Sequence, residues 1–102
     1  NGLQATSTTK EIFPIENLPQ KWSSFGWNVI EIDGHDMVQI LDALEAAKAF
    51  TDGPSVILAH TVKGKCFAFA EGKAKYHNAA MTEEEYKEAW ACIENLKREV
   101  EA

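Results

Sequence analysis

The sequence lacks the features that mark membrane-spanning, secreted and disulfide-stabilised proteins. No stretch approaches the roughly 18 consecutive apolar residues that a membrane-spanning helix needs, and the first residues have neither the basic start nor the apolar run of a signal peptide. Only two cysteines occur, Cys66 and Cys92, and no spacing combines them with the three histidines into a zinc-binding motif. We therefore expect a soluble, cytoplasmic protein with reduced thiols and no membrane contact.

An excess of basic residues is also missing. The net charge is −6, whereas affinity for nucleic-acid phosphates comes from clustered lysine and arginine, so we expect no nucleic-acid partner. The charge is uneven, because the segment Val62–Asn78 contains four lysines and one acid, Glu71. This local positive charge favours an anion, although a solvated lysine loop explains four lysines equally well.

The pattern that is present is an alternation of short β-branched runs with helical periodicity. The 102 residues, of which 45% are apolar, suffice for one small domain or part of one. Alternation of this kind is typical of parallel α/β sheets. We therefore predict an α/β fold with three layers, built on a mostly parallel sheet, and a polar loop at Thr6–Lys10.

The first half of the sequence contains signals for two helices and two strands. A short helix is predicted from Leu18 to Phe25 and a strand from Trp27 to Ile32. Asp36 has the side chain and position of a helix N-cap, and the 3.6-residue apolar period after it predicts a helix over Met37–Phe50. The apolar run Ser55–Ala59 is typical of a strand that is covered on both faces.

The last element has the clearest helix start in the chain. Thr82 and Glu85 have the spacing of a capping box, and Met81 and Tyr86 have the spacing of a hydrophobic staple. The apolar stripe that follows needs a surface to cover. Since only two strands are visible, we expect the sheet to be completed by residues outside the 102. The stripe comprises Tyr86, Ala89, Trp90, Ile93, Leu96 and Val100.

Four strings in this order carry a family resemblance: NGLQ, KWSSFGWNVIEIDGHD, PSVILAHTVKGK and KYHN. Together they resemble the second half of the thiamine-diphosphate-binding domain of transketolases, in particular the bacterial type that is encoded as two subunits. The final TEEEYKEAW resembles the helix that closes the N-terminal subunit of that type. The resemblance implies that residues 1–80 are the C-terminal part of the diphosphate-binding domain and that residues 81–102 are its closing helix.

The resemblance implies a metal site at the start of the sequence. In the family, an asparagine side chain and the carbonyl two residues later bind the divalent ion that bridges the cofactor diphosphate, and these positions correspond to Asn1 and Leu3. Amide and carbonyl oxygens suit Mg²⁺ or Ca²⁺. The family's third protein ligand lies in a GDG motif that is missing here. From the residues alone, Asn1-Gly2 is more simply a turn or a frayed terminus.

The resemblance also implies two cofactor-binding positions near the lysines. Gly64 corresponds to the first glycine of the family's GKG loop, and His77 corresponds to a histidine near the diphosphate and the donor sugar. An imidazole there suits hydrogen bonding to phosphate or acid-base catalysis, so His77 is the catalytic candidate. From the neighbouring residues alone, an exposed loop histidine is the simpler interpretation. Cys66 and Asn78 stand where the family usually has glycine, so a different loop backbone is possible.

The other two histidines carry weaker functional signals. His35 belongs to a helix start in the family and receives no catalytic role. His60 ends a strand at the carboxyl edge, where open α/β sheets bind ligands, but lone histidines at such positions are more often structural.

The function implied by the resemblance is transfer of a two-carbon ketol unit between sugar phosphates, as in the pentose phosphate pathway. Thiamine diphosphate supplies the carbanion chemistry of this transferase. In the family, the glutamate that activates the cofactor lies in another domain across a dimer interface. We therefore expect the 102 residues to be inactive alone, to need a pyrimidine-binding domain or subunit, and to form a homo-oligomer.

Two alternatives remain open. The DGHD, GK and KYH strings also resemble 1-deoxyxylulose-phosphate synthase, although that family usually has a long insertion before DGHD that this sequence lacks. The replaced glycines and the missing GDG motif also fit a non-catalytic α/β interaction module.

Overall fold

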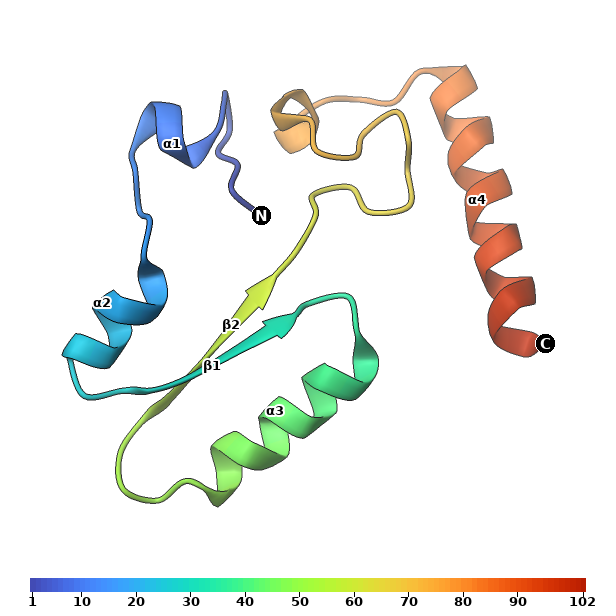
Figure 1. The fold of residues 1–102 in the computed structure, drawn as a ribbon. Helices are drawn as coiled ribbons and strands as arrows, with labels where there is room; N and C mark the ends of the chain where they lie inside the picture. Colours follow the sequence, from blue (N-terminus) through green and yellow to red (C-terminus); the bar gives the residue numbers. More distant parts are fainter. The chain divides into compact units, whose positions relative to one another are not determined.

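The structure, a computed structural model, describes all residues from 1 to 102. The chain divides into two compact units: Phe13–Thr61 forms one, and Asn1–Ile12 with Val62–Ala102 forms the other. The α-helices and strands of both units are labelled in Figure 1.

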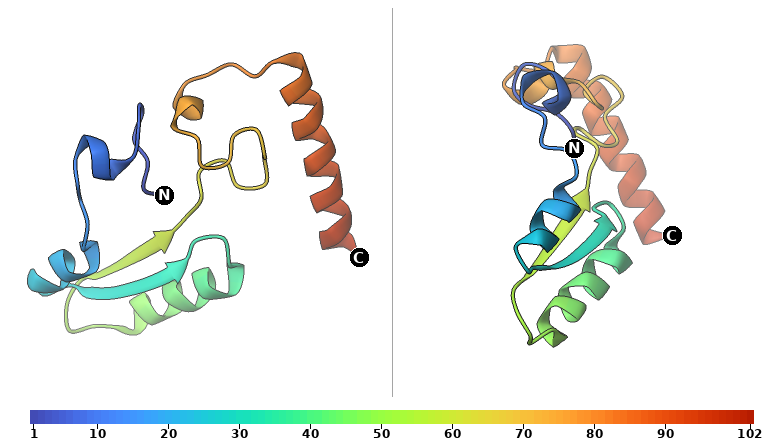
Figure 2. Two further views of the ribbon diagram at one scale, coloured as in Figure 1. Left: turned by 45° about the horizontal axis from the view of Figure 1, so that its top comes forward. Right: turned by 60° about the vertical axis from the view of Figure 1, so that its left-hand side comes forward.

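The unit Phe13–Thr61 is built around a βαβ motif. It contains α2 (Leu18–Ser24), β1 (Asn28–Asp33), α3 (Met37–Ala49) and β2 (Ser55–His60). The two strands are parallel and pair in register from Asn28↔Ser55 to Asp33↔His60. Helix α3 contacts both strands and runs beside them in Figures 1 and 2. The predicted α/β fold with a parallel sheet is therefore confirmed.

The helix between the strands starts as predicted. Oδ1 of Asp36 accepts hydrogen bonds from Val38 N at 2.9 Å and Gln39 N at 3.2 Å, which satisfies amide groups that have no partner inside the helix. Helix α3 ends at Ala49, one residue before the predicted end. Phe50 is extended and acts as its C-cap.

The first strand is shifted by one residue from the prediction. Trp27 N donates to Trp22 O at 3.3 Å, so Trp27 belongs to the turn that ends α2. Its ring packs edge-on against Trp22 with centroids 4.8 Å apart. At the other end, pairing with His60 extends β1 to Asp33 and β2 one residue beyond the predicted Ala59.

The second unit contains the short α1 (Thr9–Ile12), the 3₁₀ helix η1 (Ala74–His77) and the long α4 (Glu83–Glu101). The Thr82–Glu85 capping box is present at the start of α4, as predicted. Helix α1 occupies part of the segment predicted as a polar loop. Its start is explained by Thr8, whose Oγ1 accepts from Glu11 N at 3.2 Å.

Few side chains are buried in this chain. The buried residues are Ile32, Ala43, Ala70 and Ala89. The residues predicted to lie in a doubly covered strand, Val56 to Leu58, are half-buried, because two strands and their helices cover only part of each face. No helix of the structure has both the length and the apolar composition needed to cross a membrane.

The predicted apolar helix faces are largely exposed. On α3, Met37 is 66% and Leu41 59% exposed; on α4, Tyr86 is 52% and Trp90 49% exposed. Met81, the other member of the predicted staple, is also exposed. Each of these faces is therefore available to a further layer.

Candidate functional site

The predicted metal ligands lie in a tight turn. Oδ1 of Asn1 accepts a hydrogen bond from Leu3 N at 3.0 Å, and Gly2, at φ 67, allows the reversal. Leu3 forms an isolated antiparallel bridge with Thr8. The carbonyl oxygen of Leu3 accepts none of the chain's hydrogen bonds. The turn therefore holds the amide oxygen of Asn1 and the backbone of Leu3 close together.

These oxygens suit a hard divalent ion but do not form a complete site. Mg²⁺ prefers about six oxygen ligands and Ca²⁺ six to eight. No group of three or more histidine, cysteine, aspartate or glutamate residues in the chain could hold a metal. The two oxygens therefore suit part of the coordination sphere of such an ion, and the chain itself supplies no further cluster of ligands.

Gly64 lies in a compact loop that is closed at its base. Gly72 N donates to Lys63 O at 2.9 Å, and Phe67 N donates to Gly64 O at 3.0 Å. Gly64 has φ 66, and a Cβ there would lie 3.0 Å from the carbonyl carbon and oxygen of Ala70. The loop backbone therefore requires glycine at this position.

Cys66 adopts the backbone conformation that a glycine would favour. Its φ is 77, a value uncommon for residues with a side chain. Its amide donates to Oε2 of Glu71 at 3.2 Å, and its carbonyl accepts from the Cys92 thiol at 2.9 Å. Cys66 therefore has a left-handed backbone of the kind that favours glycine, although it carries a side chain. Asn78, the other position where the family usually has glycine, has φ −150, which any residue adopts.

One of the four lysines in the segment Val62–Asn78 donates its side-chain hydrogen bonds to backbone carbonyl oxygens. Nζ of Lys73 donates to Phe69 O at 2.8 Å and to Ala68 O at 3.4 Å. Lys75 lies with its Nζ 4.7 Å from the centroid of the Tyr76 ring. Lys63 and Lys65 make no side-chain hydrogen bond or ion pair within the chain. The positive charge is therefore available to an anion mainly from Lys63 and Lys65.

His77 is the last residue of η1. Its side chain is exposed and has no hydrogen-bond partner in the chain. The neighbouring Tyr76 is half-buried, and its hydroxyl donates to Glu85 on α4. Sequence reasoning recognised Glu85 only as part of a capping box. It missed the contact with Tyr76, which no local pattern indicates.

The predicted site residues all belong to the same compact unit. Asn1, Leu3, Gly64 and His77 lie within Asn1–Ile12 and Val62–Ala102. No hydrogen bond joins Asn1 or Leu3 to Gly64 or His77. Their roles toward a cofactor stay predictions.

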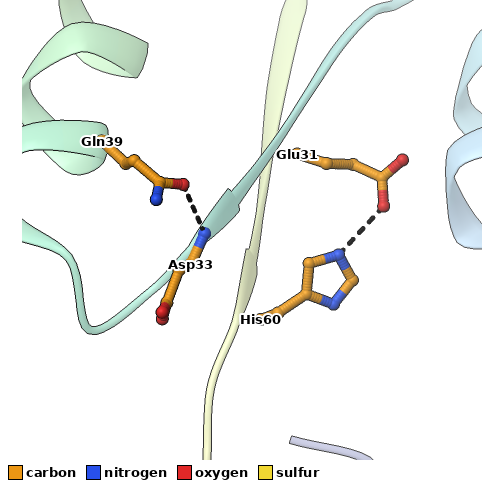
Figure 3. A network of polar contacts seen from close by, with 4 residues as sticks. All are labelled: Glu31, Asp33, Gln39 and His60. Atoms are coloured by element: carbon orange, nitrogen blue, oxygen red, sulfur yellow. Dashed lines mark hydrogen bonds and ion pairs between the residues drawn. The ribbon is translucent and has the colours of Figure 1, made fainter.

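His60 lies in the other unit, at the carboxyl ends of the parallel strands. Figure 3 shows its Nε2 directed at the carboxylate of Glu31 on the neighbouring strand, at 2.9 Å. On the other side of β1, Oε1 of Gln39 accepts from Asp33 N at 2.9 Å. His60 therefore has a structural partner, Glu31, within the sheet. The two side chains lie near the carboxyl ends of the strands, where open α/β folds bind ligands.

The turn after β1 is supported by its own side chains. His35 N donates to Oδ1 of Asp33 at 2.9 Å, and Gly34 N donates to His60 O at 2.8 Å. A Cβ at Gly34 would lie 2.6 Å from Cγ2 of Thr61, so glycine is required by close approach. The Asp33-Gly34-His35-Asp36 string thus has a structural explanation.

Comparison with known proteins identifies the family. Residues 1–94 match the family described as transketolase, thiamine diphosphate binding domain. The chain is 47% identical over 94 residues to a 6-deoxy-6-sulfo-D-fructose transketolase subunit of Clostridium sp. strain MSTE9, covering 92% of this chain and 34% of that protein. It is 36% identical over 89 residues to an apulose-4-phosphate transketolase subunit of Phocaeicola vulgatus, covering 87% and 32%.

The fold agrees with a solved structure. The crystal structure of transketolase from Campylobacter jejuni matches with a TM-score of 0.78 and 34% identity, over 87% of this chain and 14% of that one. The chain spans about a third of the length of the two subunits named above. The matched residues include the Asn1 turn, the βαβ motif, the Gly64 loop and His77. The chain belongs to the transketolase family and forms part of its thiamine diphosphate binding domain.

Proposed function

We propose that the protein acts in a transketolase that transfers a two-carbon ketol unit between sugar phosphates. The observation that carries the proposal is the family match over residues 1–94. The left-handed backbone of Cys66 supports it, because the loop keeps a glycine-type conformation where the sequence departs from the family. When bound, thiamine diphosphate supplies the carbanion chemistry of the reaction.

The residues of this chain would bind and orient the cofactor's diphosphate. Oδ1 of Asn1 and the carbonyl oxygen of Leu3 are the proposed ligands of Mg²⁺ or Ca²⁺. Gly64 would keep the loop beside the diphosphate in its compact form, because the backbone of Ala70 fills the space that a side chain would need. The exposed imidazole of His77 would donate a hydrogen bond to a phosphate or substrate oxygen, or move a proton to it.

The enzyme would need a partner. The relatives from Clostridium and Phocaeicola are named as subunits of transketolases. We therefore propose that a pyrimidine-binding domain or second subunit completes the active site, that the assembly is oligomeric and that it works in the cytoplasm. The exposed apolar faces of α3 and α4 support such association. The 102 residues are expected to be inactive alone.

The test is reconstitution of the reaction. The parent protein and its partner subunit, supplied with thiamine diphosphate and Mg²⁺, should transfer a two-carbon unit from a ketose phosphate to an aldose. Omission of either the cofactor or the partner should abolish the transfer. In a parallel assay supplied with pyruvate and glyceraldehyde phosphate, formation of 1-deoxyxylulose phosphate with release of carbon dioxide would instead favour the synthase.

A second measurement distinguishes an enzyme from an interaction module. Calorimetric titration of the parent protein with thiamine diphosphate and Mg²⁺ should show binding, whereas the isolated 102 residues should bind negligibly. A parent protein that associates with its partner but binds no cofactor would support the non-catalytic interpretation.

A further inference from the structure

A single carboxylate joins η1 to the first turn of α4. The Tyr76 hydroxyl donates to Oε1 of Glu85, and Oε2 of the same carboxylate accepts from Thr82 N at 2.8 Å. In return, Oγ1 of Thr82 accepts from Glu85 N at 3.2 Å. Glu85 therefore completes the helix cap with one oxygen and holds the end of the Tyr76 side chain with the other.

The Tyr76 ring is fixed on further sides. Phe69 packs edge-on against it with centroids 5.6 Å apart, and Nζ of Lys75 lies 4.7 Å from its centroid. The backbone amide of Tyr76 donates to the carbonyl oxygen of Lys73, the N-cap of η1, at 3.3 Å. The shared hydrogen bond lowers the pKa of Glu85 and raises the pKa of Tyr76, as a phenol that donates to a carboxylate requires.

His77 has no such support of its own. Its imidazole is exposed and has no hydrogen-bond partner in the chain. The position of this side chain is therefore set by the backbone of η1, and within η1 the preceding residue, Tyr76, makes the anchoring contacts. An acid-base group that is displaced by as little as 1 Å loses much of its effect on a reaction.

We propose that Tyr76 and Glu85 are positioning residues for His77, in a chain of contacts from the first turn of α4 through the Tyr76 hydroxyl to η1. The inference rests on the function proposed above for His77. It assigns to α4 a role in holding the site, in addition to its role as a packing helix. Neither residue needs to touch the substrate or the cofactor.

The sharpest variant is Tyr76→Phe in the complete enzyme with its partner subunit. It removes only the hydroxyl and leaves both the ring and the Thr82–Glu85 cap intact. We expect kcat to fall by about tenfold, with little change in KM or in the midpoint of thermal unfolding. Ser24→Ala is the control, because it also removes one hydroxyl that donates a hydrogen bond, to Lys21 O at 2.7 Å, but in α2, which holds no candidate site residue. It should leave kcat unchanged.

A double-mutant cycle with His77→Ala separates positioning from general structure. If Tyr76 acts through His77, adding Tyr76→Phe to His77→Ala should lower kcat no further. Glu85→Gln keeps an oxygen that can accept a hydrogen bond from the Tyr76 hydroxyl, so it should retain more activity than Glu85→Ala.

The outcomes are distinct. An unchanged kcat in Tyr76→Phe, or the same fall with and without His77, would overturn the positioning role while leaving the proposed function intact. Full activity in His77→Ala would overturn the proposed role of His77 and the inference with it.

Discussion

The thiol of Cys92 on α4 donates a hydrogen bond to the carbonyl oxygen of Cys66 at 2.9 Å. Cys66 is the residue with φ 77 in the loop that contains Gly64. The contact involves only the backbone of Cys66, so the side chain at this position is free to change without removing the acceptor. Together with the Tyr76–Glu85 contact, it connects α4 to the segment that contains the candidate site.

The first prediction concerns the side chain of Cys66. A left-handed conformation costs a residue with a Cβ about 1–2 kcal/mol, and glycine loses roughly 0.5–1 kcal/mol more in chain entropy on folding. Cys66→Gly should therefore leave the free energy of unfolding unchanged or raise it by up to about 1.5 kcal/mol, as measured by urea denaturation. Cys66→Val should lower it, because a branched Cβ fits this conformation worst. A marked loss of stability in Cys66→Gly would show that the thiol itself is needed.

The second prediction compares two glycines with nearly equal φ. Gly64 has φ 66 and Gly72 has φ 69, but only at Gly64 would a Cβ meet other atoms, 3.0 Å from the backbone of Ala70. Gly72→Ala should cost about 1 kcal/mol of unfolding free energy from backbone strain alone, and Gly64→Ala about 2–3 kcal/mol. Equal losses in urea denaturation would mean that Ala70 moves away without cost.

The third prediction concerns the cap of α3. The hydrogen bonds from Gln39 lower the pKa of Asp36 below its usual 3.8. Since the folded pKa is depressed, this contribution to stability is fully present above about pH 3.8 and is lost as the pH falls through the lower folded value. Asp36→Ala should lower the midpoint of thermal unfolding by a few degrees at neutral pH, whereas Asp36→Asn, also a good cap, should lower it less. The difference between wild type and Asp36→Asn should shrink in acid.

The fourth prediction tests the Tyr76–Glu85 contact directly. The hydrogen bond from Tyr76 is the largest cause of the lowered pKa of Glu85, whose ordinary value is 4.5. Tyr76→Phe should therefore raise the Glu85 pKa toward 4.5, while the cap from Thr82 keeps it somewhat below that value. The measurement is an NMR titration of the side-chain carboxyl carbon. Identical titration curves in the two proteins would contradict the contact.

The fifth prediction concerns His77. Because its side chain is exposed and makes no hydrogen bond in the chain, His77→Ala should leave the thermal midpoint almost unchanged. In the complete enzyme it should lower the rate by roughly 10²- to 10⁴-fold if the imidazole acts on a phosphate or substrate oxygen. Retention of more than about half the activity at saturating cofactor would remove His77 from the mechanism.

The contacts of the nearby lysines decide which of them is a suitable control for His77→Ala. Lys73→Ala would be a natural comparison if that lysine contributed only a diffuse charge, but Nζ of Lys73 binds the carbonyl oxygens of Phe69 and Ala68. Its removal should therefore disturb the loop. Lys63→Ala is the better comparison, since Lys63 makes no side-chain hydrogen bond or ion pair within the chain. The variant changes the charge available to an anion without disturbing the loop.

Much of the fold was predictable because helix signals act over a few residues. Asp36 caps α3, and Thr82 and Glu85 cap α4, as their spacing indicated. The errors were also local: Trp27 belongs to a turn through its bond to Trp22 O, and Thr8 starts a helix within a predicted loop. The exposure of the apolar face of α4 agrees with the expectation that residues outside the 102 complete the sheet, whereas α3, expected to pack on the sheet, also leaves Met37 and Leu41 exposed. Burial depends on a covering layer that sequence periodicity alone does not supply.

The sequence by itself determined the caps, the approximate strands and, through its motifs, the family and the candidate site residues. Only the tertiary structure decided the parallel register and the contacts of Tyr76 with Glu85, Cys92 with Cys66 and His60 with Glu31. These pairs are separated by 9, 26 and 29 residues. Capping and periodicity act within one or two helical turns, whereas contacts at these separations depend on how the backbone brings distant segments together.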